Sequence, residues 1–166
     1  MSTFLIEAMK ANDWPAVRSI YLEGIATGHA TFETEAPSWE DWNASHHQFG
    51  RLVARETDRV VGWAALSPVS RRQVYAGVAE VSVYVTGDSR GKGVGRALLD
   101  QLICESEQNG IWTLQASVFP ENAATIGLHR ACGFREVGRR ERISRRNGMW
   151  RDTVLLERRS PRVGVE

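Results

Sequence analysis

A short segment that follows a valine-rich run combines three glycines with three basic side chains. Glycine lets the backbone approach a ligand closely, and the free N–H groups at a helix start attract anions such as a pyrophosphate. The basic side chains would add positive charge, so the segment is typical of a pyrophosphate-binding turn. Its spacing matches neither a Walker loop nor the dinucleotide fingerprint, and a tight strand-to-helix connection with solvated charges is the alternative. The segment consists of Arg90, Gly91, Lys92, Gly93, Val94, Gly95 and Arg96.

A single carboxylate, Glu80, interrupts the otherwise apolar run that leads into this segment. Burying a carboxylate is costly unless the group is paired or takes part in chemistry. A carboxylate that lies close to an amine can remove its proton as a general base. Glu80 is therefore the candidate base, and the alternative is a glutamate on a solvent-facing strand position. We expect a β-bulge to begin one residue after it.

Hydrophobic spacing and capping residues predict the elements that position these groups. Asn12 to Pro15 supply a cap and an early proline, and the helix that follows runs to about Ala26. Ser38 with an acidic group three residues later opens a second helix. A third helix follows the glycine segment and ends at Asn109 and Gly110. Strands are expected over residues 3–8, 52–54, 60–69 and 75–85, with a hairpin at residues 57–59.

The last third of the chain predicts one more strand, a short helix and a final hairpin. The strand covers Trp112–Val118, the helix covers Asn122–Ala131 and stops at Gly133, and two strands flank Asn147 and Gly148. No internal repeat or linker interrupts the chain. We therefore expect one mixed α/β domain over residues 1–158 and a loose C-terminal tail over residues 159–166.

Composition limits the class of protein. The 166 residues are 42% hydrophobic and 25% charged, as in a single globular domain. Lys and Arg total 21 against 20 for Asp and Glu, so no overall field draws the chain to nucleic acid or lipid. The start of the chain lacks the pattern of a signal peptide, and Cys104 and Cys132 are too few and too distant for a zinc site. We expect a cytoplasmic protein that binds no membrane and no metal.

A local basic surface is the remaining argument for nucleic acid. From Arg135 onward the chain holds ten arginines against five acidic residues. These arginines alternate along predicted strands and are interleaved with acids, and neither a recognition helix nor an aromatic platform accompanies them. A solvated face is the favoured interpretation, and no nucleic-acid partner is expected.

The motifs taken together resemble the GNAT superfamily of acetyl-CoA-dependent N-acetyltransferases. The pattern Arg-x-x-Gly-x-Gly follows a valine-rich strand and is itself followed by a helix, a strand, Asn122 and the run Leu128–Phe134. The resemblance covers about residues 3–157. More narrowly, four motifs resemble the phosphinothricin acetyltransferase family: Ala30–Phe32, Ala79–Val85, the Leu128–His129 pair and Asn147–Asp152.

The resemblance implies a fold and a place for the cofactor. The fold is a single domain with a twisted mixed β-sheet that is flanked by helices and splayed at the fourth strand, with acetyl-CoA in the gap. Backbone groups of Val83 and Val85 would hold the pantetheine. The segment from Arg90 to Arg96 would hold the pyrophosphate, and Asn122 would contact the cofactor further along.

The resemblance also suggests acid–base residues. An ammonium group cannot attack a thioester until it loses a proton, which is the task of Glu80. His129 takes the place of the tyrosine with which many GNAT enzymes protonate the leaving thiolate. Its imidazole can donate a proton or orient a water, and a hydrogen-bonded structural histidine is the alternative. Tyr84 is a second candidate acid, with plain packing as its alternative.

The implied acceptor is a small amino acid with an oxygen-bearing tail, such as phosphinothricin, methionine sulfoximine or methionine sulfone. Arg72, next to Arg71 and upstream of Tyr75, could bind a carboxylate or phosphinate. Several relatives have a charged residue where this chain has Ala76, which leaves the carboxylate partner open. Phe32 and Trp150 would line the pocket, and core packing is their alternative. The family typically forms homodimers.

Two other functions remain open at this point. One is acetyl transfer to another amine, such as a polyamine, an aminoglycoside or a protein N-terminus. A pocket rich in carboxylates would favour polyamines, and a basic pocket would favour amino acids. The other is a cofactor-binding sensor without turnover, which the presence of Glu80 disfavours.

Overall fold

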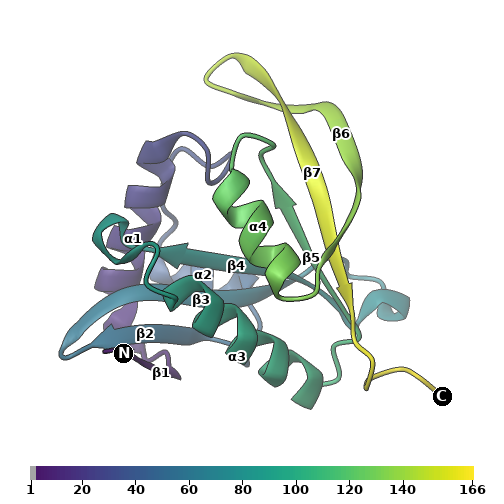
Figure 1. Ribbon diagram of the computed structural model, residues 1–166, viewed down its shortest axis with the longest axis horizontal. Coiled ribbons are helices and arrows are strands. Elements are labelled where there is room, and N and C mark those ends of the chain that lie inside the picture. Colours follow the sequence, from purple (N-terminus) through teal and green to yellow (C-terminus); the bar gives the residue numbers. More distant parts are fainter. Residues whose placement is uncertain (1–2) are drawn as a thin grey trace.

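A computed structural model describes residues 3–166 of the chain. Its strands form one seven-stranded sheet in the order β1-β2-β3-β4-β5-β7-β6, with helices on both faces (Figure 1). The strands are β1 Leu5–Ala8, β2 Leu52–Glu56, β3 Arg59–Pro68, β4 Val78–Val85, β5 Thr113–Val118, β6 Arg135–Arg146 and β7 Met149–Arg159. The helices are α1 Trp14–Thr27, α2 Trp39–Ser45, α3 Val94–Gln108 and α4 Ala123–Ala131, with short 3-10 turns at Ala11–Asp13, Gln73–Tyr75 and Gly87–Ser89.

The helix boundaries follow the signals that the sequence carries. Ser38 caps α2, since its hydroxyl accepts a hydrogen bond from the Asp41 backbone N–H at 3.1 Å. Gly28 ends α1 in the left-handed conformation, with φ of 78°. The predicted mixed α/β fold and the predicted hairpins are confirmed, the last one turning at Asn147 and Gly148.

Two apolar cores lie on opposite faces of the sheet. On one face α3 buries Leu98, Leu99 and Leu102 against the sheet. On the other face α1 and α2 bury Val17 and Trp42, among others, around the fully enclosed Trp63 of β3. Burial of apolar surface on both faces stabilises the central strands and makes them a rigid support for a site.

The parallel pair of β4 and β5 holds together at one end only. The two strands pair at Val78–Thr113, Ala79–Leu114 and Glu80–Gln115 and then diverge. Figure 1 shows β5 and β7 rising away from the line of β4. The splayed sheet expected from the resemblance is therefore present, and β4 is the strand at which it opens.

Two local predictions around β4 were wrong. The strand begins at Val78 rather than at Tyr75, and residues 73–75 form a 3-10 turn. Gly77, between the turn and the strand, packs so closely on Trp112 that a Cβ on it would come within 2.0 Å of the Trp112 ring. The expected bulge after Glu80 is absent, since β3 and β4 pair without a register shift from Gly62–Val85 to Pro68–Ala79.

The end of the chain, expected as a tail, makes hydrogen bonds to the domain. The backbone N–H of Ser160 donates to the Trp112 carbonyl at 2.8 Å, and its hydroxyl donates to Glu107 at 2.9 Å. The Arg159 guanidinium donates to the Val163 carbonyl at 2.7 Å. Across residues 3–166, no helix combines the length and the hydrophobicity that a membrane crossing needs.

Candidate active site

The separation of β4 and β5 opens a cavity of about 1400 Å³. Residues 80–85 of β4 and 116–118 of β5 form two of its sides. The rest of the lining comes from α1 and the loop after it, from α2, from the glycine segment before α3 and from α4 with the loop before it, together with single residues of β3 and β7. A cavity of this size accommodates a cofactor and a small acceptor together.

The glycine segment borders the cavity in the conformation that its composition predicts. Gly91 and Gly93 have φ of 74° and 86°, which L side chains rarely adopt, and no atom lies within 4 Å of the position of a Cβ on either residue. Gly93 is also the N-cap of α3, so the N–H groups of the first helical turn are next to this open space. Arg90 and Arg96 line the cavity, and Arg96 pairs with Asp100 at 3.0 Å.

Three further residues that were predicted to bind the cofactor line the same cavity. Val83 and Val85 line it on the part of β4 that no longer pairs with β5. Asn122 lines it at the start of α4, where its side-chain oxygen accepts from the Thr125 N–H at 3.2 Å. The side-chain amide of Asn122 donates to the His29 carbonyl at 3.3 Å. Asn122 thus joins the start of α4 to the loop after α1.

Glu80 lies at the inner end of the cavity, where the pairing of β4 and β5 ends. Burial raises the pKa of this carboxyl above its ordinary value. Hydrogen bonds from the Gln115 side chain and the Ser117 backbone, together with the charge of Arg140, oppose that rise. A half-buried carboxylate with a raised pKa is a better proton acceptor than one in water, as a general base requires.

His129 contributes a second titratable group to the cavity lining. Its side chain is almost fully buried, and Nδ1 lies 2.8 Å from the Thr125 carbonyl oxygen. Because a carbonyl only accepts, Nδ1 carries the proton and donates it. Burial lowers the pKa of the imidazole, so the ring is neutral near pH 7 and Nε2 is an acceptor. Nε2 is buried and has no partner among residues 3–166.

Comparison with known proteins decides the family. The model of the acetyltransferase (GNAT) family matches residues 14–134. The chain belongs to the GNAT acetyltransferase family. It is an acetyl-CoA-dependent N-acetyltransferase.

Three similar proteins illustrate the relationship. A phosphinothricin N-acetyltransferase of Alcaligenes faecalis is 35% identical over 160 residues, which cover 92% of this chain and 81% of that protein. A methionine sulfoximine and methionine sulfone acetyltransferase of Pseudomonas aeruginosa is 31% identical, with 87% and 88% covered. A GNAT phosphinothricin acetyltransferase of Sinorhizobium meliloti, solved with acetyl-CoA, aligns with a TM-score of 0.88 at 28% identity, with 99% and 92% covered.

The aromatic candidates of this GNAT enzyme occupy different environments. Tyr84 lines the cavity, but its ring stacks on Trp63 with centroids 4.9 Å apart, and burial raises its pKa well above the ordinary value. Such a hydroxyl keeps its proton at all physiological pH values. Phe32 lines the cavity and meets Phe119 edge to face at 4.8 Å.

Four predicted residues do not line the cavity of their own chain. Lys92 is exposed between the two glycines. The Arg72 guanidinium lies 5.5 Å from the Tyr75 ring, and both side chains are exposed. Trp150 is 52% exposed near the tip of the β6–β7 hairpin, beneath the Arg145 guanidinium at 4.4 Å. Within one chain the structure therefore brings none of Arg72, Tyr75 and Trp150 to the cavity.

The sequence reasoning missed several charged residues of the lining. Carboxylates outnumber arginines there, and Glu33 is close enough to influence the pKa of Tyr84. Glu80 was predicted and Asp41 lies in α2, but no local pattern in the sequence singles out Glu33, Glu35 or Glu121, because the loops that carry them are irregular. The acidic side chains are Glu33, Glu35, Asp41, Glu80 and Glu121, and the arginines are Arg90 and Arg96.

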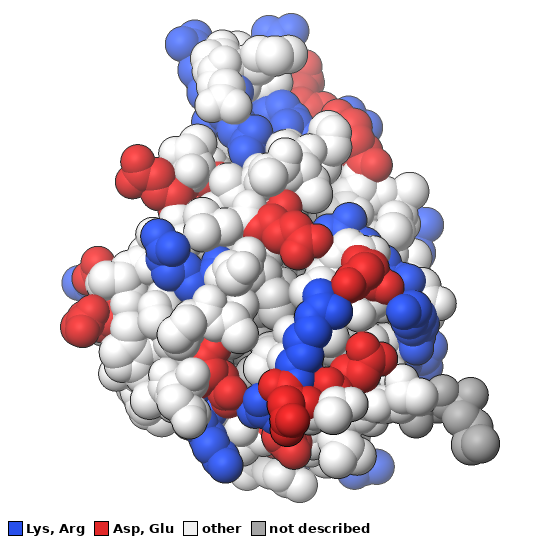
Figure 2. Space-filling model, turned by 90° about the vertical axis from the view of Figure 1, so that its left-hand side faces the viewer, with Lys and Arg blue, Asp and Glu red and all other residues white. Residues whose placement is uncertain are grey.

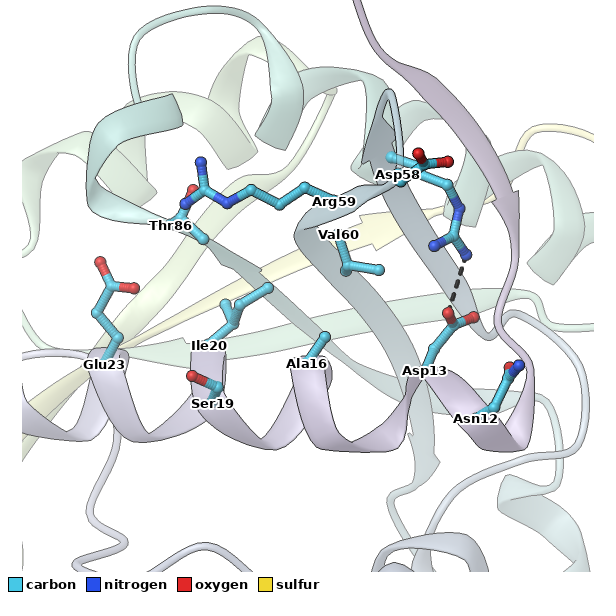
Figure 3. Close-up of a pocket in the computed structure, with 11 residues that line it drawn as sticks. Asn12, Asp13, Ala16, Ser19, Ile20, Glu23, Asp58, Arg59, Val60 and Thr86 are labelled. Atoms are coloured by element: carbon cyan, nitrogen blue, oxygen red, sulfur yellow. Dashed lines mark hydrogen bonds and ion pairs between the residues drawn. The ribbon is translucent and has the colours of Figure 1, made fainter.

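A smaller cleft of about 530 Å³ lies between α1 and the β2–β3 hairpin (Figure 3). Four of the five charged side chains that line it have partners within the protein, and Asp58 is the fifth. Asp13 accepts a hydrogen bond from Arg55 at 2.9 Å, and Arg59 pairs with Asp88 at 2.9 Å. Glu23 accepts from the Gly87 backbone N–H at 2.6 Å. With these groups satisfied within the protein, we assign this cleft no ligand.

The surface charge is mixed rather than concentrated. Figure 2 shows basic and acidic side chains interspersed over one face, with basic ones gathered at the top, where Figure 1 places the β6–β7 turn. Several of the arginines of β6 and β7 are in ion pairs, including Arg135 with Glu157 and Arg139 with Asp152. Among the described residues, no three His, Cys, Asp or Glu side chains gather as a metal site.

Proposed function

We propose that this GNAT enzyme transfers an acetyl group from acetyl-CoA to the amino group of a small amino acid. Phosphinothricin, methionine sulfoximine and methionine sulfone are the acceptors of this proposal. The similarity to the enzymes of Alcaligenes faecalis and Pseudomonas aeruginosa over most of the chain carries it. Assembly as a homodimer remains a prediction that light scattering would test.

In this proposal the glycine segment and β4 set the orientation of acetyl-CoA in the cavity. Its pyrophosphate would lie at Gly91 and Gly93, where the backbone leaves open space beside a helix start and Arg90 supplies positive charge. Its pantetheine would follow the free side of β4 at Val83 and Val85. The bound molecule supplies an activated acetyl thioester, which this orientation brings toward Glu80.

Glu80 would remove the proton from the acceptor ammonium, directly or through one water. The freed nitrogen lone pair would then form a bond to the acetyl carbon, and the carbon–sulfur bond would break with its electron pair going to sulfur. The second proton that the nitrogen loses on becoming an amide would pass, through water, to the thiolate. Because burial raises the pKa of Glu80, its carboxylate binds the proton more tightly than an exposed one does. General-base help of this kind is typically worth about a hundred- to ten-thousandfold in rate.

The leaving thiolate needs a proton, and His129 is a candidate for binding the water that would donate it. Its Nε2 is a buried acceptor without a partner, so a water could bind there only after the side chains around it move, and such a water would be oriented to protonate the thiolate. Tyr84 keeps its hydroxyl proton and is the other candidate donor. His129 as a purely structural group is the alternative to both.

A free-thiol release assay with acetyl-CoA tests the proposal. Methionine sulfone, methionine sulfoximine and phosphinothricin should be acetylated well above spermidine, an aminoglycoside or a lysine peptide. Amidation of the acceptor carboxylate should raise KM strongly. A preference for spermidine would overturn the choice of acceptor and leave the acetyltransferase activity intact.

One observation favours a second candidate, a polyamine or another multiply charged amine. Five carboxylates line the cavity against two arginines, and both arginines lie on the glycine-segment side. Acidic groups attract a second ammonium group and repel an acceptor carboxylate. Under this candidate, Glu33→Gln would lower kcat/KM for spermidine several times more than for methionine sulfone, which has a single ammonium group.

A further inference from the structure

Arg151, near the start of β7, reaches two loops that are far from each other in sequence. Its guanidinium donates to the Gly28 carbonyl at 3.0 Å, and the same group lies 3.2 Å from His29 Nδ1. It also pairs with Glu121 at 3.3 Å and lies 3.9 Å from the centre of the Phe119 ring. The side chain is only 15% exposed, although its backbone lies on an exposed hairpin.

The two loops that Arg151 contacts both line the active-site cavity. The first, residues 28–32, follows α1, and the second, residues 119–122, joins β5 to α4. They also contact each other directly, through the hydrogen bond from Asn122 to the His29 carbonyl and the edge-to-face contact of Phe32 with Phe119. Arg151 thus lies at the junction of two cavity walls.

A neighbouring arginine, Arg146, contacts only one of the two loops. It donates to the Ile25 carbonyl at 2.9 Å and to the Thr31 carbonyl at 3.1 Å. These contacts hold the end of α1 and the first loop, and they do not extend to residues 119–122. Arg146 therefore provides an internal comparison for what Arg151 does.

We propose that Arg151 is a positioning residue that fixes the first loop against the second and so sets the cavity for both substrates. The proposal rests on the proposed function, in which the second loop leads to cofactor-binding Asn122 and the first loop carries acceptor-binding Phe32. Only a planar guanidinium can serve carbonyl and carboxylate partners in several directions at once. A flexible lysine ammonium at this position could not satisfy all of them.

Hydrogen exchange on the full-length protein tests this inference without any acceptor. In Arg151→Gln, backbone exchange should rise at least about fivefold in both loops, since a lost hydrogen bond to a charged group changes local opening by about that factor or more. In Arg146→Gln, exchange should rise at the end of α1 and in residues 28–32 and stay unchanged in residues 119–122. Arg139→Gln removes an exposed ion pair on the same hairpin and should change neither loop.

Steady-state kinetics give a second readout on the same variants. Arg151→Gln should raise KM for acetyl-CoA and for the acceptor together, with a smaller change in kcat, whereas Arg146→Gln should raise the acceptor KM alone. Arg151→Lys should recover only part of the loss. Glu121→Gln removes one partner of Arg151 at an exposed position. It should raise backbone exchange in residues 119–122, and it replaces Arg151→Gln in the test if that variant does not fold.

The two possible failures are distinguishable. Unchanged exchange in residues 119–122 of both Arg151→Gln and Glu121→Gln would overturn the positioning role, and so would an equal rise in Arg139→Gln. A wild-type protein that acetylates no amino acid would instead overturn the proposed acceptor. The exchange result stands in either case because it requires no acceptor.

Discussion

Glu80 and Gln115 occupy the last paired position of β4 and β5. Beyond this pair both strands continue, but they line opposite sides of the cavity instead of bonding to each other. At this branch point burial raises the pKa of the Glu80 carboxyl, and the Gln115 side chain opposes that rise. The end of strand pairing therefore places a half-buried carboxylate on a rigid strand at the inner end of the cavity.

Replacing this carboxylate by an amide should abolish the base without changing the shape of the site. Glu80→Gln is expected to lower kcat by about a hundred- to ten-thousandfold, while the Kd of acetyl-CoA stays within about twofold. Raising the pH should recover part of the rate, because more acceptor is then free amine. Thiol release and calorimetric titration measure the two effects. Near-normal turnover with an unchanged pH profile would show that Glu80 is structural, and Glu136→Gln, in an exposed ion pair, is the matched control.

The stability of the same variant has a definite pH dependence. Since burial raises the pKa of Glu80 above its usual 4.5, the folded protein binds this proton more tightly than the unfolded chain does. Ionisation of Glu80 therefore lowers the free energy of unfolding. The loss begins as pH rises through about 4.5 and is complete above the folded-state pKa. Glu80→Gln should match or exceed the wild-type Tm at pH 7, and this difference should vanish at pH 4. Loss of Tm at pH 7 would contradict this prediction.

The glycine segment can be tested against a control with the same backbone cost. Gly93→Val and Gly110→Val both place a branched residue at positive φ, which costs about 1–2 kcal/mol. Gly93 borders the cavity and Gly110 does not. Acetyl-CoA should raise the Tm of wild type and of Gly110→Val in a concentration-dependent way, and it should not raise that of Gly93→Val. An equal rise of Tm in both variants would show that the glycine segment does not contribute to acetyl-CoA binding.

Local signals in the sequence predicted most of the elements and part of the site. Ser38, Gly28 and Gly93 act within a few residues of themselves, so their effect on caps and turns follows directly from residue type. The place of Glu80 in a strand that precedes the glycine segment is likewise a local property. These features required no knowledge of distant contacts.

Other parts of the site depend on contacts that no local pattern encodes. Arg151 and Gly28 are 123 residues apart in sequence, and only the folded sheet brings them together. Arg72 is close to Glu80 in sequence, yet the 3-10 turn and the start of β4 at Val78 keep it out of the cavity of its own chain. The close packing of Gly77 on Trp112, next to that start, likewise arises between segments that are far apart in sequence.

The tautomer of His129 gives the last prediction. Its Nδ1 donates to the Thr125 carbonyl, and burial lowers its pKa below the usual 6.5. Nitrogen-15 NMR should therefore show a neutral ring protonated at Nδ1 at pH 6.5, the pH at which a histidine side chain free in water is half charged.

The same shift affects stability in a definite direction. Below pH 6.5 the unfolded chain takes up a proton at His129 that the folded protein does not, so this residue lowers stability as pH falls from about 6.5 to the folded-state pKa. In His129→Gln, Tm should fall less between pH 7 and pH 5 than in wild type, measured by calorimetry in matched buffers. A ring that is protonated at Nε2, or charged, at pH 6.5 would show that Nε2 is not a hydrogen-bond acceptor. His129 would then be a candidate for donating the proton to sulfur directly.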